Sequence, residues 1–451
     1  YSVTRSTPLF SRHIVKRVQK FMMIARFFKL QENQTNIRTE ILAGFTTFIT
    51  MGYIIFVNPQ IMTAAGMDYG ASFVTTCLVA AIACMIMGVY ANWPIGLAPG
   101  MGLNAFFTYT VVGEMGYSWQ GALGAVFLAG VIFFIISVTP VRRYILESIP
   151  MNLRIAMGAG VGLFIGFIGL KNGGIVVSNQ ATYLAIGNFT TPETLLSGLG
   201  FLIIMVLSVR RVPGAILIGI LAITSFAAGL DLIKLTDAIS SPPSIAPIFL
   251  QLDIAGALNI ALVSVIASFL FVNLFDTAGT LLAVASRARL VNEDGEIRDL
   301  DRALQADSGI SVMGAFFGCA PVTSYVESSA GASAGGRTGL TAVVVGLLFL
   351  GSIFLSPLAA AIPSCATAGA LIYVAMLMLT GMESLDWSDN SELLPALVTI
   401  FMIPMTFSIA DGIASGFISY ACIKVFSGKW QDVSLGAWML TGLFILKFAY
   451  I

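Results

Sequence analysis

Two carboxylates lie inside apolar stretches of this chain, where a charge is costly. Glu327 lies within GCAPVTSYVESSAGASAGGRTG (318–339), and Asp276 lies within VNLFDTAGT (272–280). A bilayer tolerates a charge or an irregular backbone only where protein or a water-filled cavity surrounds it. The two acids therefore predict a binding site near the middle of a membrane.

Glu327 has the chemistry to hold a polar ring. An ionised carboxylate accepts hydrogen bonds and a protonated one also donates, so Glu327 suits the edge of a heteroaromatic ring that offers N–H groups. Tyr325 can stack on such a planar ligand, and Ser328 directly follows Glu327. The alternatives are a structural Glu327, paired with Arg337 or with the backbone, and a Tyr325 that only packs.

Asp276 and Asn104 are the other polar candidates. Burial disfavours the charged form of a carboxylate, which makes Asp276 a candidate proton carrier. It can instead be a fixed acceptor for Thr277 or for backbone N–H groups. Asn104, in APGMGLNAFFTYT (98–110), can donate and accept as purine recognition needs, although Asn among small residues is often an interhelical contact. Asp411, in SIADGIAS, is predicted to cap a helix.

The composition indicates an integral membrane protein. Of the 451 residues, 57% are hydrophobic and 10% are charged, whereas soluble proteins have about 25% charged residues. We expect an all-α polytopic protein with fourteen transmembrane spans. The predicted spans lie near 41–62, 71–91, 95–112, 120–138, 152–170, 194–209, 213–230, 257–284, 306–319, 318–339, 338–356, 366–382, 393–408 and 411–426. The last apolar segment, 434–451, either spans the membrane or lies at its interface.

The distribution of basic residues predicts the orientation. With a cytoplasmic N-terminus, 20 of the 23 Lys and Arg residues face the cytoplasm, whereas Lys171 and Lys234 lie outside and Lys447 falls in the last segment. The polar stretch 286–309 is expected to be a solvated cytoplasmic connection. The chain then divides into a basic tail (1–40), seven spans (41–230), an external linker (231–256), seven further spans (257–427) and a C-terminal apolar segment (428–451).

An internal repeat relates the two sets of spans. Phe56-Val57-Asn58 recurs as Phe271-Val272-Asn273, and Ala98-Pro99 recurs as Ala320-Pro321, with offsets of 215 and 222 residues. Seven spans are an odd number, so the two halves enter the membrane from opposite sides, as 7+7 inverted repeats. In each half, Pro and small residues interrupt a corresponding span. A helix that begins within the membrane presents free backbone N–H groups, and two such half-helices can hold a polar solute.

Other functional classes fit the sequence poorly. The sole histidine, His13, lies in the tail, so neither a Ser/His pair nor a histidine-based zinc site can form within the membrane, and we expect no enzyme and no metal site. The five cysteines show no metal-ligand or disulfide spacing. Gly158, Gly162 and Gly166 recur every four residues and predict a close helix contact, either fixed or sliding.

Four motifs resemble one transporter family over residues 36–451. TTFITMGYIIFVNPQIM, APGMGLNAFF, NLFDTAGT and APVTSYVESSAG are similar to the adenine/hypoxanthine/guanine permease branch of nucleobase:cation symporter family 2, and GLNAFF and YVESSAG are closer to its bacterial adenine permeases. The resemblance implies a fold similar to the bacterial uracil permease. That fold has a core domain (spans 1 to 4 and 8 to 11), a gate domain (spans 5 to 7 and 12 to 14), short β-strands before the half-helices of spans 3 and 10, and often a homodimer.

The same resemblance implies a function and a site. The family's substrate-contacting positions fall on Asn104, Asp276 and Glu327, with Gly102 nearby. We expect proton-coupled import of purine nucleobases, adenine preferred, across the plasma membrane by an elevator-like motion, with the proton gradient in place of a cofactor and no nucleic-acid partner. The histidine that follows the span 8 acid in the uracil permease is absent, so a carboxylate, Asp276 or Glu327, must carry the proton. The alternative is a small-anion transporter resembling sulfate carriers, although two buried acids would repel an anion.

Overall fold

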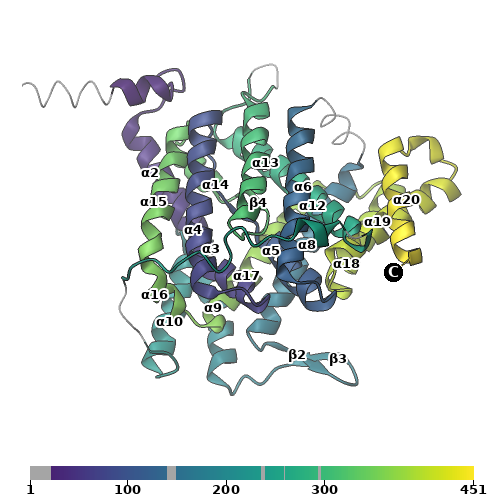
Figure 1. Cartoon of the computed structure of the whole chain (residues 1–451), viewed down its shortest axis with the longest axis horizontal. Coiled ribbons are helices and arrows are strands. Elements are labelled where there is room, and N and C mark those ends of the chain that lie inside the picture. Colours follow the sequence, from purple (N-terminus) through teal and green to yellow (C-terminus); the bar gives the residue numbers. More distant parts are fainter. Residues whose placement is uncertain (1–21, 140–148, 235–238, 259, 293–295, 451) are drawn as a thin grey trace, which may run out of the picture.

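The computed structural model describes residues 22–139, 149–234, 239–258, 260–292 and 296–450, and helices make up most of this part of the chain (Figure 1). The first half contains α2 (Ile37–Met51), α3 (Ile54–Ala64), α4 (Tyr69–Ile86), β1 (Leu97–Pro99), α5 (Met101–Ala105), α6 (Trp119–Val138), α8 (Met151–Asn172), β2 (Val176–Asn179), β3 (Tyr183–Ile186), α9 (Pro192–Val209) and α10 (Ala215–Gly229). The second half contains α11 (Ile254–Ala257), α12 (Ile260–Arg287), α13 (Leu300–Phe316), β4 (Val322–Ser324), α14 (Ser328–Ser333), α15 (Gly339–Ser352), α16 (Ser356–Ala360), α17 (Ser364–Leu379), α18 (Asn390–Met405), α19 (Ile409–Phe426) and α20 (Leu435–Tyr450).

Long apolar helices establish a multi-pass membrane protein. Within the described residues, nine helices are long and apolar enough to cross a bilayer: Ile37–Ala64, Tyr69–Ala91, Trp119–Val138, Met151–Asn172, Pro192–Val209, Leu262–Arg287, Gly339–Ala360, Ser364–Ser384 and Ile409–Phe426. Ala215–Gly229 and Asn390–Met405 are shorter apolar helices at the positions of predicted spans 7 and 13. The polytopic helical class is thus confirmed, and the count of fourteen spans stays a prediction.

The two interrupted spans meet at a short antiparallel ladder in the centre of the molecule (Figure 1). Leu97 pairs with Ser324, Ala98 with Thr323, and Pro99 with Val322. Each strand leads toward a short helix, α5 after β1 and α14 after β4. Pairing the strands gives hydrogen-bond partners to backbone groups that would otherwise have none within the membrane. The strands implied by the resemblance are therefore present.

Span 1, Ile37–Ala64, has a local break in its helical hydrogen bonding at Gly52 and Tyr53 that the sequence analysis did not predict, although both residues keep right-handed helical backbone angles. α2 ends at Met51 and α3 begins at Ile54, so Gly52 and Tyr53 interrupt a span predicted as one helix over 41–62. Gly is a poor helix former, and Pro59 inside α3 lacks the N–H for a further helical bond. The break places the side chain of Tyr53, which is 0% exposed, in the interior.

The glycines of α8 make a fixed contact with α17. A methyl group added at Gly162 would lie 2.7 Å from Cβ of Met378, and one at Gly166 would lie 2.8 Å from Cβ of Ala375. Gly158 has open space beside it and lines a cavity instead. The predicted close contact is confirmed for Gly162 and Gly166, but it joins two helices that were both assigned to the gate domain. These glycines therefore do not form a sliding surface against the core domain.

The last helix, α20, runs antiparallel along α19. Lys447 Nζ lies 2.5 Å from Asp411 Oδ1, and Thr441 Oγ1 donates to the carbonyl of Phe417 at 3.3 Å. Asp411 was predicted to cap a helix, and this is wrong. Ser408 is the cap of α19, because its hydroxyl accepts from the N–H of Asp411 at 3.2 Å, which leaves the Asp411 carboxylate for Lys447.

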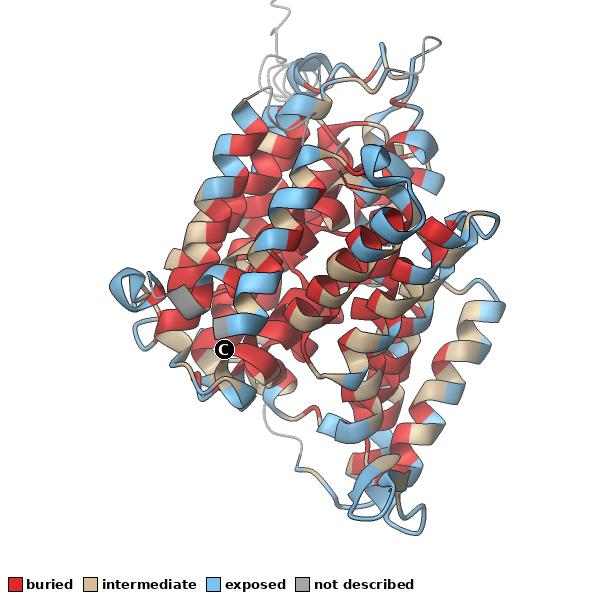
Figure 2. Ribbon diagram, turned by 90° about the vertical axis from the view of Figure 1, so that its right-hand side faces the viewer, coloured by how far each residue is buried: buried red, intermediate tan, exposed pale blue. Residues whose placement is uncertain are grey.

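Burial separates an inner packed region from an apolar outer surface. Figure 2 shows buried residues along the inner faces of the helices and exposed residues along the outer faces. Exposed side chains on the outer helices include large apolar ones, such as Leu202, Val206, Phe226 and Phe401. An apolar exterior of this kind matches a lipid environment.

Candidate functional site

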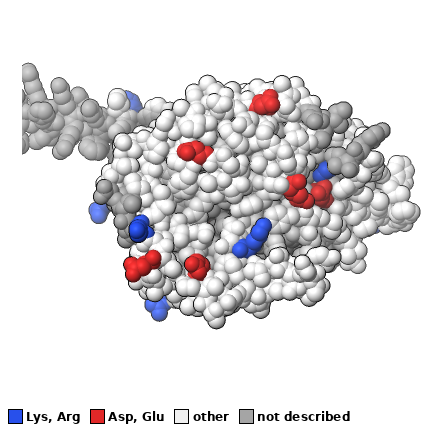
Figure 3. Space-filling model, turned by 60° about the horizontal axis from the view of Figure 1, so that its bottom comes forward, with Lys and Arg blue, Asp and Glu red and all other residues white. Residues whose placement is uncertain are grey.

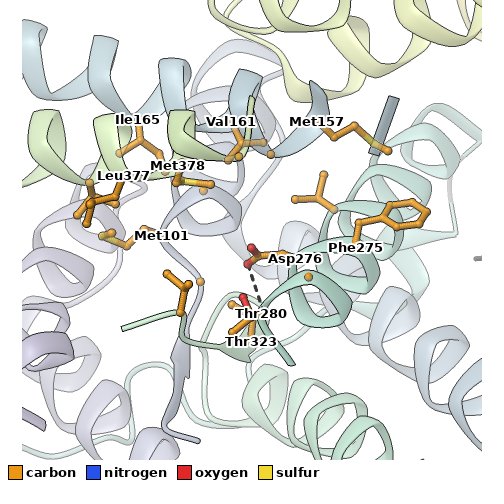
Figure 4. A pocket seen from close by; sticks show the side chains of 18 of the residues that line it. Met101, Met157, Val161, Ile165, Phe275, Asp276, Thr280, Thr323, Leu377 and Met378 are labelled. Atoms are coloured by element: carbon orange, nitrogen blue, oxygen red, sulfur yellow. Dashed lines mark hydrogen bonds between the residues drawn. The ribbon is translucent and has the colours of Figure 1, made fainter. Parts of the chain in front are cut away.

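A cavity of about 320 Å³ lies beside the β1–β4 ladder. Its polar wall comes from span 1, α12, β4 and the residues before α14, and includes Tyr53, Asp276, Thr323, Tyr325 and Glu327. Its opposite wall comes from α8 and α17 and is largely apolar, with Met157, Val161, Ile165, Leu377 and Met378 among its side chains (Figure 4). Arg154 of α8 is a charged residue that also lines the cavity. The cavity thus offers hydrogen-bond acceptors on one side and an apolar surface on the other.

Glu327 lies directly before α14 and faces this cavity. The hydroxyl of Tyr53 donates to Glu327 Oε1 at 2.6 Å. No ion pair between Glu327 and Arg337 is found among the described residues, and the backbone N–H of Arg337 donates to Glu40 Oε1 at 3.0 Å. Glu327 is therefore held by a neutral donor, which leaves further acceptor positions on its carboxylate for a ligand.

The free N–H groups expected at the start of α14 are occupied. The backbone N–H groups of Ser328, Ser329 and Ala330 donate to the carbonyls of Tyr325, Val326 and Glu327 at 3.1, 2.9 and 2.9 Å. The turn before the helix uses up these donors. A solute held by backbone N–H groups at this helix end stays a prediction, and the side chains of Tyr325 and Glu327 are polar groups that line the cavity there.

Asp276 lies on α12 and accepts from Thr323 Oγ1 at 3.3 Å, the bond drawn in Figure 4. The alternative of an acceptor for Thr277 is wrong, because Thr277 donates to Asp307 Oδ1 at 2.9 Å. Phe275 and Thr280 of the same helix also line the cavity. Asp276 and Glu327 therefore border one space, as the sequence predicted.

Asp307 is a third buried acid, and the sequence analysis missed it. It is 0% exposed on α13 and accepts from Ser324 Oγ at 2.7 Å as well as from Thr277. The hydroxyls of Thr277 and Thr323 are 3.1 Å apart, and each one donates to a carboxylate, Thr277 to Asp307 and Thr323 to Asp276. A continuous chain of hydrogen bonds between the two acids forms when one of them is protonated and donates to its threonine. The stretch 286–309 was interpreted as a solvated loop, but α13 begins at Leu300. The signal was the apolar run that starts just after Asp307.

Asn104 is buried away from the cavity. Its side chain is 0% exposed, and its Nδ2 donates to Asn58 Oδ1 on α3. Asn58 Nδ2 in turn donates to Thr76 Oγ1 on α4 at 2.7 Å. This geometry matches the alternative of an interhelical contact, and a direct role in binding stays a prediction.

Gly102, Tyr325 and Ser328 complete the predicted set. Gly102 lines the cavity, and a methyl group there would lie 2.2 Å from Cγ1 of Val161, so α5 and α8 touch at this glycine. Tyr325 also lines the cavity, and its hydroxyl donates to the carbonyl of Pro99 at 2.6 Å. Ser328 is buried and accepts from the N–H of Gly96 at 3.0 Å, so it anchors the ladder from outside the cavity lining.

The site suits a small, uncharged molecule with a polar edge. Two carboxylates on one wall attract N–H donors and repel anions, while the facing apolar wall favours a flat ring. Across the described residues there is no cluster of three His, Cys, Asp or Glu side chains that could hold a metal ion. The chemistry available here is recognition of a ligand.

The sequence also matches known transporters. Residues 38–415 match the permease family. Adenine permease AdeP of Escherichia coli (strain K12) is 48% identical over 429 residues, which are 95% of this chain and 96% of that protein. AdeQ of the same organism is 46% identical over 94% of this chain and 96% of its own length. Guanine/hypoxanthine permease PbuG of Bacillus subtilis (strain 168) is 43% identical over 94% of this chain and 99% of its own length.

A solved structure supports the fold. The transmembrane domain of a cyanobacterium bicarbonate transporter, BicA, has a TM-score of 0.63 and 16% sequence identity, and the match covers 84% of this chain and 97% of that one. At this identity the likeness shows the fold alone. The closer relatives are permeases, so this protein is a transporter and not an enzyme, as expected. The chain belongs to the permease family, as the resemblance implied, within the branch that includes adenine and guanine/hypoxanthine permeases.

Proposed function

We propose that this protein imports purine nucleobases, adenine preferred, across the plasma membrane by proton-coupled alternating access. The observation that carries the proposal is the cavity with Glu327 and Asp276 on one wall and apolar side chains on the other. A purine offers ring N–H donors at its edge and flat apolar faces, which match these two walls. The relatives named for adenine and for guanine/hypoxanthine support this substrate class.

Glu327 is proposed to accept hydrogen bonds from the edge of the purine, and Asp276 lies beside it on the same wall of the cavity. Tyr325 lies at the same wall, and Gly102 provides room where α5 meets α8. Asn104 and Ser328 act indirectly, since one holds α5 to α3 and the other holds the ladder. Substrate recognition is thus assigned to the second half of the chain more than to the first.

Proton coupling is proposed to use Asp276 or Glu327. When Asp276 gains a proton at the cavity it can donate to Thr323, which then donates to Thr277 and Thr277 to Asp307, so the proton has a route to a second carboxylate. Hydroxyl groups can donate and accept at once, which is what such a route requires. The source of energy is the proton gradient.

An elevator-like motion is supported by the division of the cavity walls between the two proposed domains. The acids and Tyr53 come from spans assigned to the core domain, whereas Val161, Ile165 and Met378 come from spans assigned to the gate domain. A ligand held by the acids would therefore move with the core domain past the apolar surface of the gate domain. Alternating access follows from that movement.

Two cavities at opposite ends of the same helices support alternating access. The first reaches Arg154 near the start of α8 and Thr380 just after α17. A second cavity of about 430 Å³ is lined by Asn172 at the end of α8 and by Ser364 at the start of α17. With the N-terminus proposed to be cytoplasmic, the first cavity faces the cytoplasm.

The proposed orientation also agrees with the charges. Figure 3 brings forward the end that carries the β2–β3 hairpin, and charged side chains are only scattered over that face. An external face poor in Lys and Arg is what the positive-inside rule requires. A homodimer and fourteen spans complete the proposal.

Uptake of labelled adenine by cells that lack purine permeases tests the function. Cells that express the wild type are expected to accumulate labelled adenine. Addition of a protonophore should stop this uptake. Glu327→Gln should lower uptake at least tenfold, since the amide cannot replace a charged acceptor, while the protein still reaches the membrane. Glu383→Gln, at an exposed position, is the matched control and should transport normally.

Two outcomes would overturn the proposal. The first is uptake that neither the protonophore nor Glu327→Gln reduces. The second is competition by sulfate but not by unlabelled purines, which would favour the anion transporter of the same architecture.

A further inference from the structure

The break in span 1 brings a tyrosine to the acid that we assign to substrate binding. Tyr53 is 0% exposed, borders the cavity and donates to Glu327 Oε1 at 2.6 Å. A second contact joins the same two segments, because Thr50 Oγ1 lies 3.4 Å from the backbone carbonyl oxygen of Glu327, although it lies closer to the carbonyl oxygen of Thr47 at 2.8 Å. Span 1 therefore contacts both the side chain and the backbone of Glu327.

Tyr53 is the side chain that donates a hydrogen bond to the Glu327 carboxylate. Glu327 stands at the cap position of α14, yet its side chain makes no capping bond, because the N–H groups of the first turn are already occupied by backbone carbonyls. A glutamate side chain has three rotatable bonds, and fixing them on binding costs entropy. A partner that fixes the carboxylate beforehand removes part of that cost.

We propose that Tyr53 is a positioning residue for the substrate, which acts by holding the carboxylate of Glu327 in the orientation that meets the purine edge. The inference rests on the proposed function of Glu327. A hydroxyl is suited to this role, since it anchors one oxygen without neutralising the charge that the purine N–H groups need. A basic side chain in the same place would compete with the substrate for the carboxylate.

Tyr53→Phe keeps the ring and removes only the hydroxyl. The variant should raise the Michaelis constant for adenine about tenfold, as expected for the loss of a hydrogen bond to a charged group. The maximal rate should stay within about twofold, because the ring still fills the break in span 1. Tyr90→Phe is the matched control, since it removes a hydroxyl that donates to Gln305 Oε1 at 2.7 Å, at an exposed position that lines neither cavity.

A double-mutant cycle separates positioning from a merely structural role. Glu327→Asp shortens the side chain by one methylene, so it no longer reaches Tyr53 from the same backbone position. In that background Tyr53→Phe should change the dissociation constant for labelled adenine by less than about twofold. Size-exclusion profiles and melting temperatures of the purified variants check that each one is folded.

The possible results have distinct meanings. Tenfold weaker binding that disappears in the Glu327→Asp background supports the inference. Equal losses in both backgrounds, or no loss from Tyr53→Phe alone, would overturn it while leaving the proposed function intact. Failure of the wild type to bind adenine would instead refute the proposed function.

Discussion

The two interrupted spans share a backbone design but differ in chemistry. In each, a strand that contains or follows a proline leads to a short helix, and the strands pair with each other. The β4–α14 arm brings Thr323, Tyr325 and Glu327 to the cavity. The β1–α5 arm brings Met101, Gly102 and Leu103, and it buries Asn104 elsewhere. One arm therefore offers acceptors, and the other offers an apolar contact.

A difference in spacing explains the contrast. Asn104 is the fifth residue after Pro99 and lies within α5, whereas Glu327 is the sixth after Pro321 and lies before α14. Asn104 is thus the fourth residue of a helix, whereas Glu327 projects from the turn that precedes one, so the two side chains leave the backbone at different points. An internal repeat thus predicts where the backbone is interrupted, but not which side chain faces the ligand.

The side chains that form hydrogen bonds with the two strands differ as well. Ser324 of β4 donates to the buried carboxylate of Asp307 at 2.7 Å. Its partner in the ladder, Leu97 of β1, uses its N–H and carbonyl to contact Cys84 Sγ at 3.2 and 3.3 Å. A thiol is a weak donor and a weak acceptor, whereas a carboxylate accepts strongly. The arm that carries the proposed substrate acceptors is thus the more firmly held.

Asp307→Asn should give the largest effect among changes to the residues that hydrogen-bond to β1 or β4. The variant keeps the shape of the side chain but places an NH₂ donor against the hydroxyl of Ser324 or Thr277, and the amide cannot take up the proton that the route from Asp276 delivers. We expect adenine uptake to fall at least tenfold, measured as an initial rate at equal membrane expression. Cys84→Ala, the corresponding change beneath β1, should lower the rate by less than about twofold. Equal effects from the two variants would remove the proposed difference between the arms.

Asn104→Ala should give a smaller effect, mainly on stability. Removing the amide leaves Asn58 Oδ1 buried without its donor, at a cost of about 1–3 kcal/mol. The melting temperature should fall, while the Michaelis constant for adenine changes by less than about threefold. A tenfold rise in the Michaelis constant at unchanged stability would mean that Asn104 contacts the substrate directly, as the family resemblance implied.

Sequence patterns predicted where the spans are interrupted better than which way a side chain points. The prolines and glycines of the two interrupted spans, and the acids Asp276 and Glu327 within apolar runs, were visible in the sequence and do lie together. The bond between Tyr53 and Glu327 joins residues 274 positions apart, so no local pattern could predict it. Asp307 was missed because its helix starts in a charged stretch that resembles a loop. Hydrogen-bond partners depend on packing between distant segments, which composition and periodicity do not contain.

Equilibrium binding of labelled adenine to the purified protein tests the central claim most directly. The account predicts saturable binding by the wild type that unlabelled adenine displaces and sulfate does not, and a loss of at least about tenfold in affinity for Glu327→Gln. Binding of equal strength by the wild type and by Glu327→Gln would contradict the claim that the β4–α14 arm holds the substrate through its carboxylate.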